Sequence, residues 1–336
     1  MKISNFDTDK KIFIIAEIGN NHEGDFELAK NMVIKAVAAG ADAVKFQTIV
    51  PCELVSSDQL ERLAMLEKFQ FSYEQFAELS ALAKKEGALF MSSPFDEITV
   101  RELNKFVPAF KVASCDVTFY PLLKEIAATG KPIIMSTGAA SEEEVLNSCK
   151  YIESCWEKAG IKSPGLALLH CVSSYPTPVN EANLKAVSTL AKTGYVAGYS
   201  DHTLGIDAAV LSIGLGARII EKHFTVDKNY SEFRDHQLSA DPNEFKLMVE
   251  KIRSAEALLG SGDITVANCE SGNRVLIRRS AAARGNIAEG SIVESDNIRW
   301  VRPGTGITPD KSAMIIGRKA TRNLIDGELF KTEDVI

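Results

Sequence analysis

The 336-residue sequence contains few of the features that mark membrane proteins or cross-linked secreted proteins. Its apolar runs stay well below the ~20 residues that a membrane-spanning helix needs. The stretch from Met1 to Lys11 lacks the apolar core of a signal peptide. The six cysteines form no Cys-x-x-Cys pair and show no spacing typical of a disulfide framework. We therefore expect free thiols in a reducing cytoplasm and no membrane segment.

An excess of positive charge is also missing. The chain carries 38 Lys and Arg against 45 Asp and Glu, a formal net charge of −7. This balance argues against a nucleic-acid partner and against binding to anionic membranes. An anionic substrate would therefore need a local cluster of basic side chains.

The composition is otherwise that of a globular protein, with 45% hydrophobic and 25% charged residues. Short apolar runs alternate with segments of helical period along most of the chain. The runs expected to be strands are 11–19, 43–46, 88–91, 109–113, 132–135, 166–169, 195–197 and 218–220. The segments expected to be helices are 26–39, 73–86, 97–105, 119–129, 141–158, 183–192, 205–215 and 242–259.

Eight strand–helix units in roughly 260 residues predict an α/β fold, a (β/α)8 TIM barrel. A doubly wound open sheet is the alternative, but no Gly-x-Gly-x-x-Gly follows any of the strands. After Gly260 the pattern changes to turns and short β-like pieces, which predict a small, mostly β domain. The expected divisions are a barrel at 1–262, a linker at 263–274 and the small domain at 275–336. The expected β pieces of the small domain are 275–279, 298–301 and 314–318.

Polar residues gather where the predicted strands end. The catalytic residues of a TIM barrel lie at the C-terminal ends of its strands, and an unpaired charge there would be costly, so we expect these side chains to form one site. The set is Glu17, Asn20, Asn21, His22, Lys45, Gln47, Ser92, Ser93, Asp96, Lys111, Ser114, Asp116, Ser136, Thr137, His170, Ser173, Ser174, Tyr175, Ser200, Asp201, His202, Glu221 and His223.

Two lysines within this set suggest a site for an anion. Lys45 and Lys111 supply positive charge, and the hydroxyls of Ser114 and Ser136 supply hydrogen-bond donors, which suits a phosphate or a carboxylate. The alternative is that each lysine extends from its strand end into bulk solvent.

Two of the five histidines, His202 and His223, follow neighbouring predicted strands and are separated by one helix length. They are either satisfied barrel histidines or two ligands of a divalent metal, for which Mn, Zn, Co or Fe suits imidazole better than Ca. Glu17 is either a general acid/base or a structural carboxylate. Cys115 and Cys171 are interpreted as small buried thiols.

These stretches resemble the N-acetylneuraminate (sialic acid) synthase family, which includes legionaminic and pseudaminic acid synthases. The resemblance covers nearly the whole chain in order. The matching stretches are Ile15-Ala-Glu-Ile-Gly-Asn-Asn-His-Glu-Gly24, Ala43-Val-Lys-Phe-Gln47, Ser93-Pro-Phe95, Lys111-Val-Ala-Ser114, Lys131-Pro-Ile-Ile-Met-Ser-Thr-Gly138, His170-Cys171, Tyr175-Pro-Thr-Pro178, Ser200-Asp-His202, Glu221-Lys-His-Phe224, Arg234-Asp-His-Gln-Leu-Ser239, Arg279-Ser280 and Arg302-Pro-Gly-Thr-Gly306.

The resemblance implies a barrel closed by an antifreeze-like (SAF) domain, in a domain-swapped homodimer where that domain caps the partner's active site. It implies condensation of phosphoenolpyruvate with an N-acetylated amino hexose such as N-acetylmannosamine, with C–O cleavage and release of phosphate. A legionaminic or pseudaminic acid synthase would instead take a 2,4-diacetamido-trideoxyhexose. Another phosphoenolpyruvate-dependent keto-deoxy sugar acid synthase is a further alternative, and a non-catalytic carbohydrate- or ice-binding protein is an alternative from a different class.

Carried over residue by residue, the resemblance assigns His202 and His223 to Mn2+, or to Mg2+ or Co2+ in its place. It assigns catalytic roles to Glu17, Asp235 and Arg302, the last from the other subunit. The residues assigned to phosphoenolpyruvate are Lys45, Ser93, Lys111, Ser114, Ser136, Ser173 and Ser200. The residues assigned to the sugar are Gln47, Asp116, Tyr175, Asp235 and Arg302. Asp116 and Ser173 stand where some sialic acid synthases have Glu and Asn, which leaves the exact sugar open.

Overall fold

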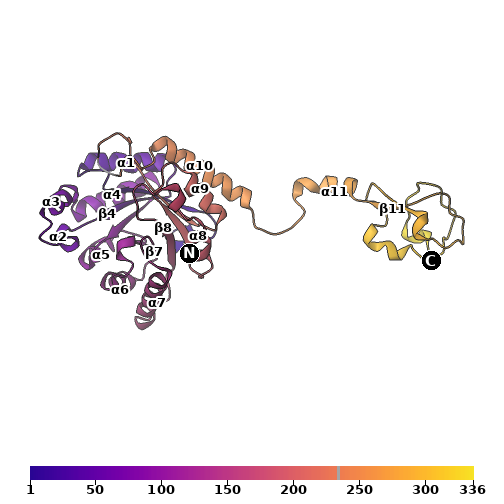
Figure 1. The fold of residues 1–336 in the computed structure, drawn as a ribbon, viewed down its shortest axis with the longest axis horizontal. Helices are drawn as coiled ribbons and strands as arrows, with labels where there is room; N and C mark the ends of the chain where they lie inside the picture. The colour runs from indigo at the N-terminus through magenta and orange to yellow at the C-terminus, as the bar shows by residue number, and fades with distance from the viewer. Residues whose placement is uncertain (233–234) are drawn as a thin grey trace. The chain divides into compact units, whose positions relative to one another are not determined.

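The computed structural model describes residues 1–232 and 235–336, so Arg234 of the matching motif lies outside the described residues. The chain divides into two compact units, Met1–Gly260 and Ser261–Ile336. Figure 1 shows the ribbon of both units. No helix among the described residues combines the length and the apolar composition needed to cross a membrane.

The N-terminal unit is built on one sheet of eight strands in the order β5-β4-β3-β10-β9-β8-β7-β6, and its hydrogen-bonded pairs are parallel. β5 and β6, the two ends of this order, also contact each other. The TIM barrel predicted from the sequence is therefore confirmed. The strands are β3 (Phe13–Gly19), β4 (Ala43–Thr48), β5 (Leu89–Pro94), β6 (Phe110–Val112), β7 (Ile133–Ser136), β8 (Leu166–Cys171), β9 (Val196–Asp201) and β10 (Ile219–His223).

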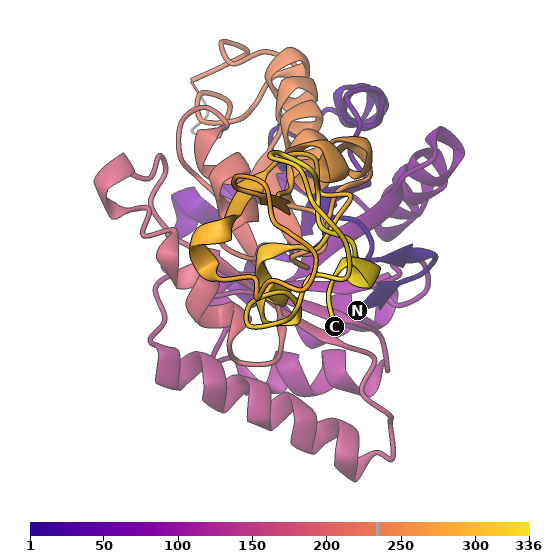
Figure 2. The same cartoon turned by 90° about the vertical axis from the view of Figure 1, so that its right-hand side faces the viewer.

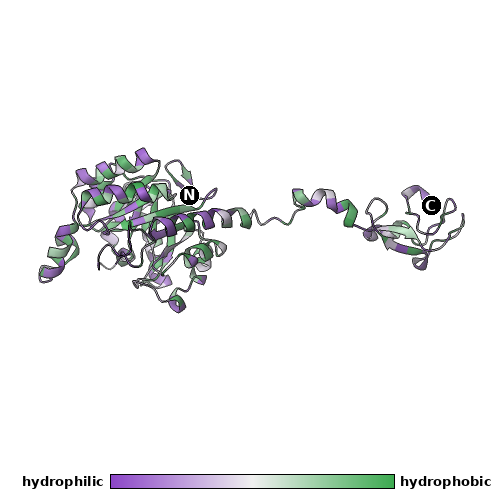
Figure 3. Cartoon of the chain, turned by 90° about the horizontal axis from the view of Figure 1, so that it is seen from above, coloured by the Kyte–Doolittle hydropathy of each residue, from purple (hydrophilic) through white to green (hydrophobic). Residues whose placement is uncertain are grey.

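Eight helices alternate with these strands and lie on the outside of the sheet (Figures 1 and 2). Figure 3 shows hydrophilic and hydrophobic residues alternating along them, as expected for helices that cover a core on one face. They are α1 (Phe26–Ala38), α4 (Tyr73–Glu86), α5 (Glu97–Leu103), α6 (Tyr120–Ala128), α7 (Glu142–Lys158), α8 (Lys185–Ala191), α9 (Asp207–Gly214) and α10 (Pro242–Leu259). Two further helices, α2 (Pro51–Leu54) and α3 (Leu60–Phe69), lie in the β4–α4 connection and were not predicted.

The helix ends follow the local sequence. Ser72 and Gln75 form a capping box that starts α4, and Gly87 ends the helix at a φ of 100°, a conformation that glycine adopts without strain. The side chain of Asp241 accepts hydrogen bonds from the first turn of α10, where Pro242 needs no partner for a missing N–H. These capping residues determine where the helices around the barrel begin and end.

The core has two layers. Side chains such as Ile14 and Ala16 point outward against the helices, and Phe13 and Ile15 point into the barrel. A small hairpin of β1 (Lys2–Ile3) and β2 (Phe6–Asp7) contributes Ile3 to the interior cluster. This hairpin was not predicted, and it packs against the start of the barrel strands.

The C-terminal unit contains one antiparallel pair, β11 (Ser280–Ala283) with β12 (Ile298–Val301), and several isolated bridges. β12 confirms the expected strand at 298–301. The expected strand at 275–279 is wrong, because α11 (Ser271–Ile277) occupies most of it and the strand begins only at Ser280. The expected strand at 314–318 is also wrong, because a 3-10 segment, Pro309–Met314, runs into a turn there. Both segments carry apolar residues, and apolar character alone does not separate a strand from a short helix.

Candidate active site

The alternation of side chains along the strands builds the site. In β3, Phe13 and Ile15 point into the barrel, so Glu17 continues the same face at the C-terminal end. In β10, Ile219 points inward and Glu221 and His223 follow at steps of two. The apolar side chains that fill the barrel interior thus fix the direction of the polar side chains at its mouth. The catalytic residues of TIM-barrel enzymes lie at this end.

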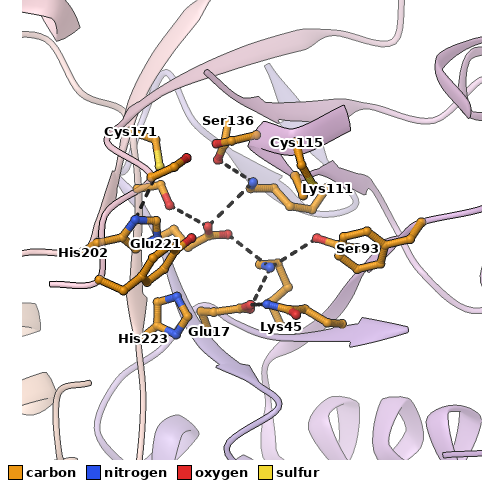
Figure 4. A pocket seen from close by; sticks show the side chains of 17 residues that line it. Glu17, Lys45, Ser93, Lys111, Cys115, Ser136, Cys171, His202, Glu221 and His223 are labelled. Carbon is orange, nitrogen blue, oxygen red and sulfur yellow. Dashed lines mark hydrogen bonds and ion pairs between the residues drawn. The ribbon is translucent and has the colours of Figure 1, made fainter. Parts of the chain in front are cut away.

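These inward positions line a cavity of about 320 Å³ at the C-terminal ends of the strands (Figure 4). The cavity-lining residues are Glu17, Lys45, Gln47, Ser93, Phe95, Lys111, Ala113, Ser114, Cys115, Ser136, Cys171, Ser173, Tyr175, Ser200, His202, Glu221 and His223. Twelve of the residues assigned to catalysis, substrates or metal from the sequence therefore share one cavity.

A network of charges crosses the floor of the cavity. Nζ of Lys45 lies 2.7 Å from Oε2 of Glu17 and 3.7 Å from Oε2 of Glu221. Nζ of Lys111 lies 3.7 Å from Oε1 of Glu221, so this carboxylate stands between the two lysines. All four side chains are at least 94% buried. The alternative that each lysine extends from its strand end into bulk solvent is therefore excluded.

Hydroxyl and amide groups complete this network. Lys45 donates to Ser93 Oγ at 3.3 Å, and Lys111 donates to Ser136 Oγ at 2.5 Å. Ser200 Oγ donates to Glu221 Oε1 at 2.8 Å. In a separate contact, Gln47 Nε2 donates to Glu17 Oε1 at 3.0 Å. These hydrogen bonds hold both ammonium groups in place. An anion that enters the cavity could contact the same lysines and serines.

Burial and neighbouring charges separate the two carboxylates. Burial raises the pKa of Glu17, although Lys45 opposes this shift. Burial acts in the same direction on Glu221, but Lys111 and Lys45 outweigh it and lower its pKa to about 2. Burial lowers the pKa of Lys111, whereas the pKa of Lys45 is raised because Glu17 and Glu221 outweigh burial. Carboxyl groups with opposite shifts in one cavity are suited to different roles.

His202 and His223 lie at one wall of the cavity, with ring centroids 5.3 Å apart. Nδ1 of His202 lies 2.8 Å from the carbonyl oxygen of Val172, which can only accept, so this nitrogen carries a proton and Nε2 has the lone pair in the neutral ring. Nδ1 of His223 is buried without a hydrogen-bond partner in the described part of the chain. An orphaned buried nitrogen beside a second imidazole with a free lone pair fits a divalent metal.

The donor set for such a metal is small. Within residues 1–232 and 235–336, no group of three or more His, Cys, Asp or Glu is arranged to hold a metal ion. The tyrosine ring of Tyr175 lies 4.2 Å from that of His202, centroid to centroid, and adds no charged ligand. The remaining ligands would therefore be water or substrate oxygens.

Three predicted site residues do not line this cavity. Asp116 is buried behind it, where Cys115 Sγ lies 3.5 Å from Oδ2, and burial raises its pKa to about 6. Asp235 lies close enough to His223 and Tyr175 to influence their pKa values. Arg302 belongs to the C-terminal unit, directly after β12. Their roles stay predictions.

Glu221 is the residue whose role the sequence assignment missed. It was recognised only as one of the polar residues near a strand end, yet it contacts both lysines and Ser200. The signal was present, because a period of two from the apolar Ile219 points Glu221 inward. Phe95 also lines the cavity without having been assigned a role.

The fold and the site define a TIM-barrel protein with a buried cavity lined by two lysines, two glutamates and two histidines. Residues 32–264 match the NeuB family, and residues 278–336 match the SAF domain. The chain belongs to the NeuB family, since the first match spans more than half of it. The resemblance noted from the sequence is thereby confirmed.

Proteins of known name align with this chain over most of its length. The chain is 37% identical to the pseudaminic acid synthase of Campylobacter jejuni, covering 99% of both chains. It is 39% identical to the N,N'-diacetyllegionaminic acid synthase of Legionella pneumophila, covering 96% of this chain and 94% of that one. A sialic acid synthetase from Leptospira borgpetersenii, solved in complex with citrate, has a TM-score of 0.75 and 34% identity, over 81% of this chain and 94% of that one.

Proposed function

We propose that this chain is a nonulosonic acid synthase that condenses phosphoenolpyruvate with an N-acetylated amino hexose and releases phosphate. The observation that carries the proposal is the burial of Lys45 and Lys111 in one cavity with Glu17 and Glu221. Membership of the NeuB family and the names of the relatives support it. The chain is a phosphoenolpyruvate-dependent transferase on this basis.

The lysine pair and the serines form the site for phosphoenolpyruvate. Lys45 and Lys111 neutralise the phosphate and carboxylate, and the hydroxyls donate hydrogen bonds from the strand ends. Glu17 and Glu221 already pair with the two lysines, so an incoming anion competes with these carboxylates for the ammonium groups. The serines proposed to join the lysines are Ser93, Ser114, Ser136, Ser173 and Ser200.

His202 and His223 would hold Mn2+, or Mg2+ or Co2+ in its place. When bound, such an ion supplies Lewis acidity toward the aldehyde of the open-chain sugar. The chain's own contribution is the tautomer of His202, which its bond to the carbonyl of Val172 holds with Nε2 unprotonated. Gln47 and Tyr175 border the same space and would orient the sugar.

The reaction begins as C3 of phosphoenolpyruvate attacks the aldehyde carbon, and positive charge develops at C2. Water then adds at C2 and Glu17 accepts its proton, which then passes to the former aldehyde oxygen, an alkoxide that becomes a hydroxyl. The tetrahedral intermediate loses phosphate by cleavage of its C2–O bond, and the lysines stabilise the departing anion. Burial raises the pKa of Glu17, which makes its carboxylate a stronger base than an exposed one.

Asp235 and Arg302 would contact the sugar, with Arg302 supplied by the second subunit of a domain-swapped dimer.

The acceptor sugar is either an N-acetylmannosamine-type hexose or a 2,4-diacetamido-trideoxyhexose. A phosphorylated sugar, as another keto-deoxy sugar acid synthase would use, is disfavoured because the described lining of the cavity includes no Lys or Arg besides Lys45 and Lys111. A non-catalytic carbohydrate- or ice-binding protein is disfavoured because such a protein has no use for a buried anion site.

Phosphate release with phosphoenolpyruvate and each acetamido hexose tests the proposal. One of these sugars should support turnover well above the others. Phosphoenolpyruvate labelled with 18O in the bridging position should lose the label to phosphate. Retention of the label in the sugar would exclude C–O cleavage, and no phosphate release with any acetamido hexose would exclude the activity.

A further inference from the structure

A second cavity, of about 900 Å³, lies at the opposite end of the barrel from the catalytic site. Its lining includes Ala41 and Asp42, which precede β4, and Lys131, which precedes β7. Residues that precede parallel strands lie at the N-terminal end of the barrel, so this cavity shares no lining with the catalytic one.

Four lysines line this N-terminal cavity, in a chain whose net charge is −7. Two of them are neutralised: Lys11 pairs with Asp42 at 2.9 Å, and Lys105 pairs with Glu102 at 2.5 Å. Asp42 is further engaged by Arg253, so it has little capacity to compensate another cation.

The other two lysines, Lys84 and Lys131, have no carboxylate within ion-pair distance among the described residues. Lys131 is half-buried, and its Nζ donates to the carbonyl oxygens of Asn104 at 2.5 Å and Val107 at 2.7 Å. Burial lowers the pKa of Lys131 with no charge to oppose it. A partly buried ammonium without a counter-ion is costly, and a bound anion would remove that cost.

The rest of the lining is aromatic and apolar. Phe6 and Phe106 are each partly exposed, and Pro108 and Leu89 lie beside them in the same cavity. Nζ of Lys11 lies 5.6 Å from the ring centroid of Phe6, so one lysine of the cavity contacts one of its aromatic rings. Aromatic faces suit the stacking of a planar base, and lysines suit phosphates.

We infer that this N-terminal cavity binds a nucleoside diphosphate, with the phosphates at Lys84 and Lys131 and the base against the aromatic side chains. Its volume lies within the range of sites for ligands of that size. The inference does not depend on the activity proposed for the catalytic cavity, because no residue is shared between the two.

Titration calorimetry of the full-length protein with ADP tests the inference. Wild-type protein should bind one ADP per chain, and Lys84→Ala should weaken binding by about tenfold or more, since a charge-assisted contact is lost. Lys84 is exposed on α4, so its removal should leave the fold intact. Lys150→Ala, an equally exposed lysine on α7, is the matched control and should bind as the wild type does.

Lys131→Gln retains a donor for the two carbonyl oxygens and should weaken ADP by a similar factor. Lys111→Met, in the catalytic cavity, should leave ADP binding unchanged. No saturable ADP binding, or unaltered binding to Lys84→Ala and Lys131→Gln, would overturn the inference, as would loss of binding in Lys111→Met alone. If inorganic pyrophosphate binds as tightly as ADP, the aromatic side chains do not contribute and the nucleoside assignment is wrong.

Discussion

Asp201 and Lys222 form a buried ion pair immediately beside the two histidines, with Lys222 Nζ 2.9 Å from Asp201 Oδ2. They are register partners in the parallel ladder of β9 and β10, and each directly precedes a histidine in sequence. Because side chains alternate along strands, the ion pair faces away from the cavity while His202 and His223 face into it. The pair therefore fixes, from behind, the two strand ends that present the imidazoles.

Replacing Lys222 by Met should destabilise the barrel strongly. Asp201 would keep its bonds from Thr203 but lose its counter-charge in a fully buried position. Removal of one partner of a buried pair costs about 3–5 kcal/mol, measurable by urea unfolding. Lys228→Met is the matched control, because Lys228 pairs with Glu244 at a partly exposed site, where a loss of less than about 1 kcal/mol is expected. Equal losses for the two variants would refute the assigned role of the buried pair.

Removal of either imidazole should strongly weaken binding of a divalent metal. With only two protein ligands proposed, His202→Ala and His223→Ala should each reduce Mn2+ affinity by about a hundredfold or more, seen by calorimetry without substrates. His170→Gln is the control, since the ring of His170 lies outside the catalytic cavity and bonds the carbonyl of Ala182. Wild-type metal affinity in both alanine variants would exclude the histidine pair as the metal site.

The pH dependence of turnover should report Glu17. A base acts only when ionised, and burial raises the pKa of Glu17, so kcat should rise with pH through a value above that of an ordinary carboxyl group. Glu221 remains ionised above about pH 2 and cannot produce this rise. Glu17→Gln should lower kcat by about 10²–10⁴ and remove the acidic limb. Persistence of the same limb in Glu17→Gln would assign it to another group.

The barrel could be predicted from the sequence because short, largely apolar runs recur and polar residues follow them, as Asn20 and Asn21 follow Phe13–Gly19. The N-terminal hairpin at 2–7 could not, because two-residue strands carry no periodicity. The expected strand at 275–279 is wrong for a related reason, because the seven residues of α11 are too few for their period to separate helix from strand.

The sequence could predict which residues belong to the candidate site, but not which of their side chains contact one another. The strand ends identified Lys45 and Lys111, yet sequence alone could not show that Glu221 stands between them. That arrangement depends on the closure of the sheet, which brings β4, β6 and β10 around one space. Arg302 belongs to the C-terminal unit, and the role proposed for it rests on a second subunit.

A swapped dimer predicts complementation between two inactive variants. Glu17→Ala lacks the base of the barrel, and Arg302→Ala lacks the residue supplied by the partner. In a mixture unfolded and refolded together at equal ratio, half of the dimers are mixed, and each mixed dimer has one intact site of two. About a quarter of wild-type phosphate release should therefore return. Absence of recovery, with dimers present by sedimentation, would show that each site is built from one chain.

The loop that carries Asp235 is fastened to the β3–α1 loop through His236. Nε2 of His236 lies 3.1 Å from Oε1 of Glu23, and its Nδ1 lies 2.6 Å from the hydroxyl of Thr225. Nδ2 of Asn21 adds a second attachment, to the carbonyl oxygen of Phe224 at 2.9 Å. Asp235 therefore lies in a segment that the β3–α1 loop contacts at two points, His236 and Phe224.

Glu23→Gln should therefore act on the sugar and not on phosphoenolpyruvate. The amide keeps the size of the side chain but weakens the contact with His236, so Asp235 is less well positioned. The KM for the acceptor sugar should rise about three- to tenfold while the KM for phosphoenolpyruvate is unchanged. Glu27→Gln, an exposed carboxylate on α1 near the same loop, is the control and should alter neither constant. A parallel rise in both KM values would mean that Glu23 supports the fold of the barrel mouth and has no specific effect on Asp235.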